Sequence, residues 1–290
     1  GTLNVNGVPR GGVRLPGVSG SYLSTPDSAA LSVTGDIDIR CRVALPDYTS
    51  ADSGLVTKYG AAGQRSFRFY VDSLGRLNFN MSTDGTANAS LQWQAGPTFV
   101  DGTTYWVRTT RTVAGTLRFF YAADQPTMPT SWTEAGLSQT LSAGQNIFDS
   151  TSPVEVGSMT LGTAYLANGV FYRAQIRNNV LDDGSGIVFD TDFTNQFGPF
   201  YLDSSTNRAI VTPSTTLANV GDGRIVIESA TAGSAATLEV GSTTGMNYVD
   251  LKDVVMNGAD TYIGGTSVIR SNVKGVRRGP KTGMSMMMGV

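Results

Sequence analysis

The chain has 290 residues, 40% hydrophobic and 15% charged, with a formal net charge of −2, so it can form a large core and gives no reason to expect nucleic acid as a partner. With no histidine and one cysteine, Cys41, it lacks Ser–His and Cys–His nucleophile pairs, histidine metal sites and intramolecular disulfides. The low charge and the 35 glycines indicate an all-β fold with many short strands.

Alternation of apolar and polar residues dominates positions 20–200, and the run GDIDIRCRVAL (35–45) shows it first. The apolar side consists of Ile37, Ile39, Cys41 and Val43, and the charged side of Asp36, Asp38, Arg40 and Arg42. We interpret the charged side as a solvent-facing surface laced with cross-strand ion pairs. The neighbouring arginines favour ionised aspartates, whereas a glycosidase acid needs a raised pKa.

Two hairpins are predicted next, followed by two more strands. RSFRFYVDSLGRLNFNM (65–81) alternates on both sides of a turn at Gly75, and YWVRTTRTVAGTLRFFYA (105–122) does so around Gly115. VFYRAQIRN (170–178) and IVFDTDF (187–193) read as later strands. Because no segment has a helical period over three turns, we expect an antiparallel sandwich with one face of each sheet buried.

The character of the sequence changes after Pro213, where short β-like runs lie among glycines and few aromatic residues. We therefore predict an N-terminal arm (1–15), a sandwich domain (16–212) and a C-terminal assembly extension (213–290). Residues 261–290 hold five basic and no acidic side chains, and the chain ends in GMSMMMGV. Methionine packs adaptably against irregular protein surfaces. The predicted assembly contacts are Arg277, Arg278, Lys281, Met284, Met286, Met287 and Met288.

Four segments resemble, in order, the laminin-G-like jelly roll, a relative of the concanavalin A-type lectin and glucanase sandwich. They are GVSGSYLSTPDSAALSVTGDIDIRCRVAL (17–45), LVTKYGAAGQRSFRFYVDSLGRLNFNMSTDG (55–85), YWVRTTRTVAGTLRFFYAAD (105–124) and NGVFYRAQIRNNVLDD (168–183). The first carries a P-D-S-x-x-L turn, and the second opens with two apolar residues, any residue and lysine. The residue patterns of these strands and turns resemble those of virion proteins of tailed bacteriophages that infect actinobacteria.

This resemblance implies a non-enzymatic virion protein, with a tail-tip or minor tail component as the first expectation. A capsid decoration protein or a glycan-binding host-recognition adhesin is the alternative. The expected partners are other virion proteins, further copies of the chain and a host cell-surface glycan. We expect no membrane insertion, because no apolar run approaches the roughly 20 residues of a span, and the N-terminus does not resemble a secretion signal. The expected location is the virion, assembled in the host cytoplasm.

The resemblance also allows catalytic and calcium sites to be considered. Glucanases of this fold carry E-x-D-x-E on one strand, whereas residues 36–40 read D-I-D-I-R, with Arg40 in place of the last carboxylate. We therefore expect no catalytic residues and no cofactor. Related jelly rolls often bind Ca²⁺ through oxygen ligands. The candidate carboxylates for such a site are Asp182, Asp183, Asp190 and Asp192.

Three tryptophans offer rings that can stack on a sugar. Trp106 lies within a predicted strand, where we expect it to fill the core. Trp132 follows a proline-rich loop, QPTMPTSW, and is the better candidate for an exposed contact. The predicted glycan-binding residues are therefore Trp132 and Trp93, with no metal ligand assigned.

Overall fold

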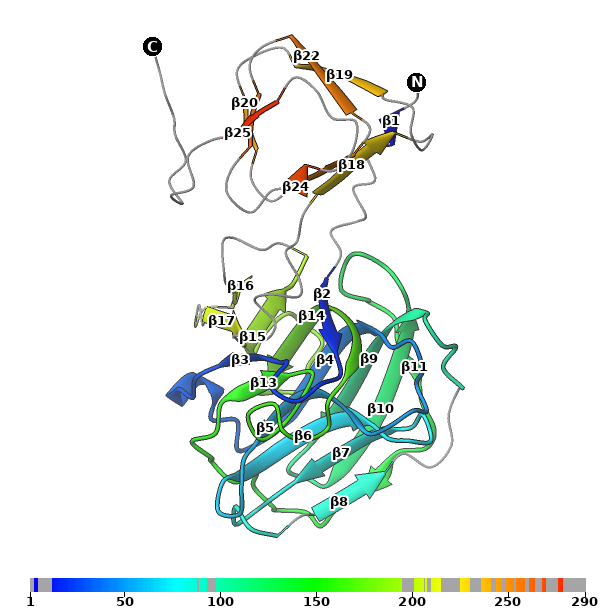
Figure 1. Cartoon of the computed structure of the whole chain (residues 1–290). Helices are drawn as coiled ribbons and strands as arrows, with labels where there is room; N and C mark the ends of the chain where they lie inside the picture. Colours follow the sequence, from blue (N-terminus) through cyan, green and yellow to red (C-terminus); the bar gives the residue numbers. More distant parts are fainter. Residues whose placement is uncertain are drawn as a thin grey trace. The chain divides into compact units, whose positions relative to one another are not determined.

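The computed structural model describes residues 12–87, 89–92, 98–194, 201–205, 207 and 210–214, together with short strands outside these ranges (Figure 1). The chain forms two compact units, Gly12–Gly221 and a second composed of Gly1–Gly11 with Asp222–Val290. In the described part of the chain, no helix is long and apolar enough to cross a membrane.

The first unit is an all-β jelly-roll sandwich of two antiparallel sheets (Figure 1). Sheet I contains, in spatial order, β11 (Thr133–Glu134), β10 (Thr116–Ala123), β9 (Thr104–Arg111), β4 (Ile37–Ala44), β14 (Asn168–Arg177) and β15 (Ile187–Asp192), with β12 (Gln139–Thr140) beside β10 and β2 (Val13–Pro16) beside β14. Sheet II contains β16 (Tyr201–Leu202), β17 (Ile210–Pro213), β3 (Leu23–Thr25), β13 (Val154–Val156), β5 (Ser53–Tyr59), β6 (Arg65–Val71), β7 (Leu77–Met81) and β8 (Ala89–Gln92). The 3₁₀ turn η1 (Ala29–Leu31) is the one helical element among the described residues.

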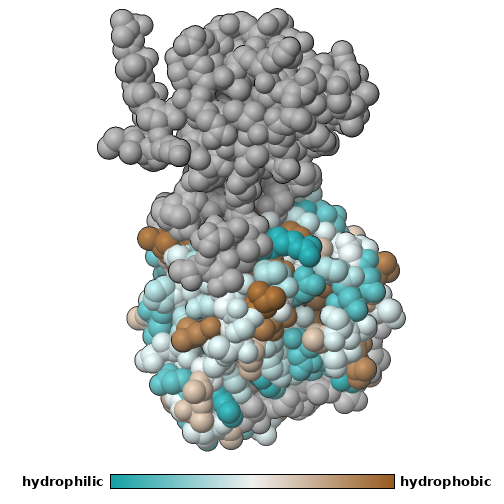
Figure 2. All heavy atoms as spheres, in the orientation of Figure 1, coloured by the Kyte–Doolittle hydropathy of each residue, from teal (hydrophilic) through white to brown (hydrophobic). Residues whose placement is uncertain are grey.

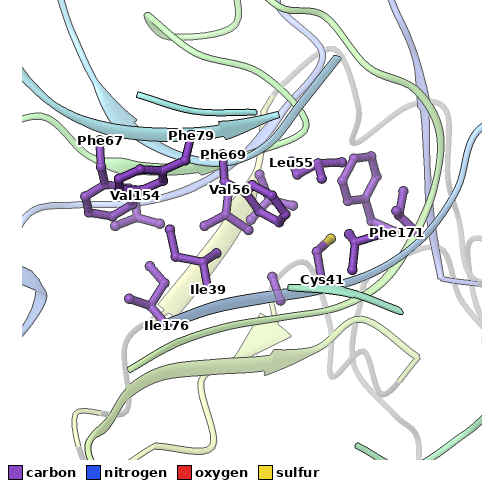
Figure 3. Packing of buried hydrophobic residues seen from close by; sticks show 14 of the residues in the cluster. Ile39, Cys41, Leu55, Val56, Phe67, Phe69, Phe79, Val154, Phe171 and Ile176 are labelled. Carbon is purple, nitrogen blue, oxygen red and sulfur yellow. The ribbon is translucent and has the colours of Figure 1, made fainter. Parts of the chain in front are cut away.

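The core lies between the two sheets and is built from the predicted apolar faces. Ile39 and Cys41 of β4 point toward Phe69 and its neighbours on sheet II (Figure 3). Each of these side chains is at most 1% exposed. Removal of this apolar surface from water is the main force that holds the sheets together. Burial raises the pKa of the Cys41 thiol, which makes this cysteine a poor nucleophile.

Both predicted hairpins are present. In β6 and β7, Phe69 lies opposite Phe79, and the turn between them has Gly75 with a φ of 74°. In β9 and β10, Phe119 lies opposite Thr109, and Gly115 adopts a φ of 97°. Only glycine takes up such left-handed conformations readily, which is why glycine stands at both turns.

The described strands of the second unit form three small sheets, in which all pairings except that of the N-terminal strand are parallel (Figure 1). Along the chain the strands are β18 (Ile225–Ser229), β19 (Ala236–Val240), β20 (Thr244–Met246), β21 (Val249–Lys252), β22 (Val254–Gly258), β23 (Thr261–Ile263), β24 (Val268–Ile269) and β25 (Val276–Arg278). All pairings among these strands are parallel: β21 pairs with β18 and β24, β19 with β22, and β23 with β20 and β25. β1 (Leu3–Asn4) pairs antiparallel with β18. The described strands therefore form a three-sided parallel coil.

The predicted assembly residues fall in this second unit. Arg277 and Arg278 belong to β25, the last described strand of the coil. Lys281, Met284, Met286, Met287 and Met288 lie outside the described residues. The assembly role of all seven residues therefore stays a prediction.

Candidate functional site

The centre of the charged side of β4 is buried, which corrects our interpretation of that side as solvent-facing, whereas the expected cross-strand ion pairing is present between Asp38 and Arg108. Asp38 is 0% exposed, Arg40 2%, and Arg108 of the neighbouring strand β9 6%. Two segments from elsewhere in the chain cover this outer face of sheet I. One is the loop 178–186 between β14 and β15, which carries Asp182, and the other is the segment before β11, which carries Trp132.

Five charged side chains form an ion cluster on this face: Asp38, Arg40, Arg108, Arg177 and Asp182. Asp38 accepts hydrogen bonds from Nε and Nη2 of Arg40, at 3.2 and 2.7 Å, and from the same two atoms of Arg108, at 3.0 and 2.8 Å. Asp182 accepts one from Arg40 Nη2 at 2.7 Å. Such forked, charge-assisted contacts fix the planes of the guanidinium groups.

Interactions within the cluster favour the ionised forms of Arg40 and Asp182, whereas burial and the Arg40 charge lower the pKa of Arg177. Burial acts to lower the pKa of Arg40, but hydrogen bonds and charges from Asp38 and Asp182 outweigh it and raise the pKa above its usual value. Burial acts to raise the pKa of Asp182, yet Arg40, Arg108 and Arg177 together hold it below its usual value. With three guanidinium groups and two carboxylates, the ionised cluster carries a net charge of +1.

Two aromatic rings lie on the guanidinium groups, and we call Trp132 and Phe120 the aromatic platform. The Trp132 ring centroid is 5.6 Å from the Arg40 guanidinium and 5.4 Å from that of Arg108. The Phe120 centroid is 5.2 Å from the Arg108 guanidinium, so this cation is flanked by both rings. Both rings are half-buried, and contacts of this kind contribute about 0.5–2 kcal/mol each.

Trp106 supports the platform from below. It is fully buried, as expected, but it lies on the outer face of sheet I and not in the hydrophobic core. Its indole N–H donates to the Gln125 carbonyl at 2.9 Å, and its ring meets Trp132 edge to face, with centroids 6.5 Å apart. Trp132 therefore rests on two cations and one ring. Trp93, the other predicted sugar contact, lies outside the described residues.

Each of the four candidate calcium ligands accepts hydrogen bonds from a different partner within the protein. Asp182 belongs to the ion cluster, and Asp190 accepts hydrogen bonds from Arg173 at 2.7 and 2.6 Å. The other two carboxylates accept local bonds, Asp183 from Ser185 and Asp192 from Thr194. In the described part of the chain, these residues form no group of three or more that could hold a metal ion.

Sequence reasoning missed Arg108, Arg177 and Phe120. The signal for Arg108 was available, because it alternates with Trp106 and therefore shares its face. Its register opposite Arg40, which places two arginines side by side across β4 and β9, cannot be read from either strand alone. Asp182 and Trp132 reach the face from loops, where no periodicity predicts direction.

A separate open cleft of about 700 Å³ lies along β15. Its lining is mostly small and polar, with Asp190 as its one charged residue, and none of its lining residues is aromatic. Elsewhere on the face shown in Figure 2, apolar side chains are scattered among hydrophilic ones. We take the aromatic platform as the candidate ligand site because its two rings lie on buried arginines of the ion cluster.

Comparisons with known proteins describe the fold. No protein-family profile matches the chain, and no curated protein sequence is similar to it. Among solved structures, it is similar to the CBM40 domain of the Ruminococcus gnavus IT-sialidase bound to α2,3-sialyllactose, with 16% identity, a TM-score of 0.44, and coverage of 60% of this chain and 94% of that one.

Two further solved structures are similar. A protein from Bacteroides ovatus, described as carbohydrate-binding, has 10% identity and a TM-score of 0.44, with 70% of this chain and 58% of that one covered. The heptameric SAP-like pentraxin of Limulus polyphemus has 13% identity and a TM-score of 0.41, with 71% and 95% covered. At these identities and scores the likeness is one of fold, and the ligand of this chain has to be argued from its own residues.

Proposed function

We propose that this protein binds a glycan on the outer face of sheet I and does so as a non-enzymatic component of a tailed-phage virion. The virion part of the proposal rests on the sequence resemblance. The glycan part rests on the residues of the aromatic platform.

The glycan proposal rests on one observation, the contact of the Trp132 ring with the Arg40 and Arg108 guanidinium groups. A half-buried indole beside charged side chains can offer an apolar face to a sugar ring. The two guanidinium groups below it are held by Asp38 through forked hydrogen bonds, so the ring is fixed before ligand arrives. A preorganised contact loses little side-chain entropy on binding.

The non-enzymatic part of the proposal is supported by the burial and hydrogen bonding of two candidate acid residues, Asp38 and Glu155. Asp38 is 0% exposed and both of its oxygens accept hydrogen bonds from Arg40 and Arg108, so it does not face a substrate. Burial raises the pKa of Glu155, which is the direction that a general acid requires. Glu155 is 1% exposed, however, and accepts hydrogen bonds from Ser158 Oγ, Leu161 N and Gly162 N. Glu155 therefore holds a turn together and does not face a substrate.

We expect Trp132→Ala to weaken glycan binding by at least about tenfold, because a central aromatic contact contributes more than about 1.4 kcal/mol. An array of bacterial-envelope and animal glycans, probed with the full-length chain, selects the ligand, and calorimetric titration measures affinity. Phe148→Ala is the matched control, since Phe148 is also half-buried but lies against Gly85, beyond β7 of sheet II. Equal affinity of wild type and Trp132→Ala would contradict the proposal.

The second unit favours a role in assembly. Parallel coils offer sheet edges at their ends, and among the described strands β22, β24 and β25 each pair on one side only. We propose that this unit holds the jelly roll in the particle, as a tail-tip or minor tail component or as a capsid decoration. Sedimentation velocity should show self-association of the full chain and a monomer for a chain ending at residue 214. Monomers in both samples would argue against assembly through copies of this unit.

A further inference from the structure

The two carboxylates of the ion cluster differ in their exposure to solvent. The Asp38 side chain is 0% exposed and comes from strand β4, whereas the Asp182 side chain is 43% exposed and comes from a loop. Asp182 lies within 2.7 Å of Arg40 Nη2, 3.3 Å of Arg177 Nη1 and 3.4 Å of Arg108 Nη1. One solvent-accessible carboxylate is thus surrounded by three guanidinium groups whose side chains are at most 8% exposed.

The cluster needs an anion at this position. Without Asp182, three buried guanidinium groups would share the single carboxylate of Asp38, and uncompensated buried charge is strongly unfavourable. Three other arginines on this face have carboxylates of their own, Arg42 with Asp124, Arg118 with Glu134 and Arg173 with Asp190. Arg14 of β2 instead donates to the Asn168 amide oxygen at 3.3 Å. The positive charge of the ion cluster lies directly beside Trp132.

The loop does not depend on Asp182 for its position. Arg177 donates from Nε to the Ser185 carbonyl at 3.1 Å and from Nη1 to the Leu181 carbonyl at 3.0 Å. Asp183 accepts hydrogen bonds from the backbone N–H and the hydroxyl of Ser185. Rotation of the Asp182 side chain toward solvent would leave these contacts in place and free one anion position.

We infer that Asp182 occupies the place of an acidic group of the ligand, and that the site takes a glycan with a carboxylate or sulfate group. The inference rests on the proposed glycan function. The sugar ring stacks on Trp132, and its acidic group displaces Asp182 from Arg40 and Arg108. Guanidinium groups match both anions through forked hydrogen bonds. The Arg40 and Arg108 guanidinium groups lie 5.6 and 5.4 Å from the Trp132 ring centroid, so the anion position adjoins the stacking position.

The test compares Asp182→Asn with Asp183→Asn in the full chain. Asp183 is the adjacent carboxylate and bonds Ser185 only locally, so it controls for a lost charge on the loop. The probes are methyl β-D-glucuronide, methyl β-D-glucoside 6-sulfate and neutral methyl β-D-glucoside, titrated by tryptophan fluorescence. We expect Asp182→Asn to bind both acidic probes at least tenfold more tightly than wild type, with binding of the neutral probe and of Asp183→Asn unchanged.

A second measurement serves if Asp182→Asn folds poorly. The thermal unfolding temperature is measured in sodium sulfate and compared with that in sodium chloride of equal ionic strength. Sulfate should stabilise Asp182→Asn more steeply than wild type or Asp183→Asn, since general salt effects act on all three. An unchanged ratio of acidic to neutral binding and equal sulfate slopes would overturn the inference. Loss of neutral-probe binding in Trp132→Ala would then still support the glycan function. Steeper sulfate stabilisation with no sugar binding at all would instead leave an anion site and reject the glycan function.

Discussion

Asp38→Asn should lower the free energy of unfolding of the jelly roll by about 3–5 kcal/mol, the largest effect we expect from a single change on sheet I. The carboxylate is fully buried and receives forked hydrogen bonds from Arg40 and Arg108. An amide removes the charge and turns its N–H₂ toward guanidinium donors, which leaves two buried cations with Asp182 as their remaining partner. Urea unfolding followed by tryptophan fluorescence measures the effect, because all three tryptophans lie between residues 93 and 132.

Asp36→Asn is the matched control on the same strand face. Asp36 is half-buried, and its carboxylate accepts a hydrogen bond from the Val113 backbone N–H at 2.7 Å. Loss of one charge-assisted bond of this kind should cost about 1–2 kcal/mol. Equal destabilisation by the two substitutions would show that the arginine clamp contributes nothing beyond an ordinary hydrogen bond.

Asp27→Asn should destabilise the jelly roll by about 2–3 kcal/mol, because it deprives a buried lysine of its closest partner. The Lys58 side chain is 1% exposed, and its Nζ lies 2.7 Å from Asp27 Oδ1 and 3.7 Å from Asp149 Oδ1. The effect should stay below that of Asp38→Asn, since the Asp27 side chain is 26% exposed. Urea unfolding again provides the measurement.

A second substitution separates the ion pair from other roles of Asp27. Lys58→Met in the Asp27→Asn background replaces the cation that has lost its closest partner with an apolar chain of similar length, and should restore most of the lost stability. Asp149→Asn should change stability by less than about 0.5 kcal/mol, because that contact is long and its carboxylate is 56% exposed. If Lys58→Met lowers stability further, the lysine does more in this structure than pair with Asp27.

Local patterns predicted the sandwich and its hairpins. Alternation identified Ile39 and Cys41 of β4, and Phe69 and Phe79 of the β6–β7 hairpin, as core residues, because the side-chain period of a strand is set by the strand itself. The structure also explains why two motifs stand where they do. Asp27 of the P-D-S-x-x-L turn forms an ion pair with Lys58 of the next segment and so anchors the turn to β5.

The candidate site was predicted only in part, because what covers a sheet face is not encoded in its strands. Alternation placed Asp38 and Arg40 together on one face. This face is buried because two distant residues cover it, namely Trp132 and Asp182, the latter 142 residues after Arg40. Their approach depends on the path of loops. In the second unit, short strands could be recognised, but parallel pairing of positions 18 residues apart, such as Ala236 with Val254, has no local signal.

The most direct test of glycan binding at the aromatic platform follows the three indole N–H signals of the ¹⁵N-labelled full chain during titration with the ligand selected on the array. Trp132→Phe assigns the Trp132 signal by its disappearance, and Trp93→Phe assigns that of Trp93. We predict that, of the three indole N–H signals, ligand shifts that of Trp132 most. Saturable binding that leaves the Trp132 signal unmoved would contradict the assignment of the site to the aromatic platform.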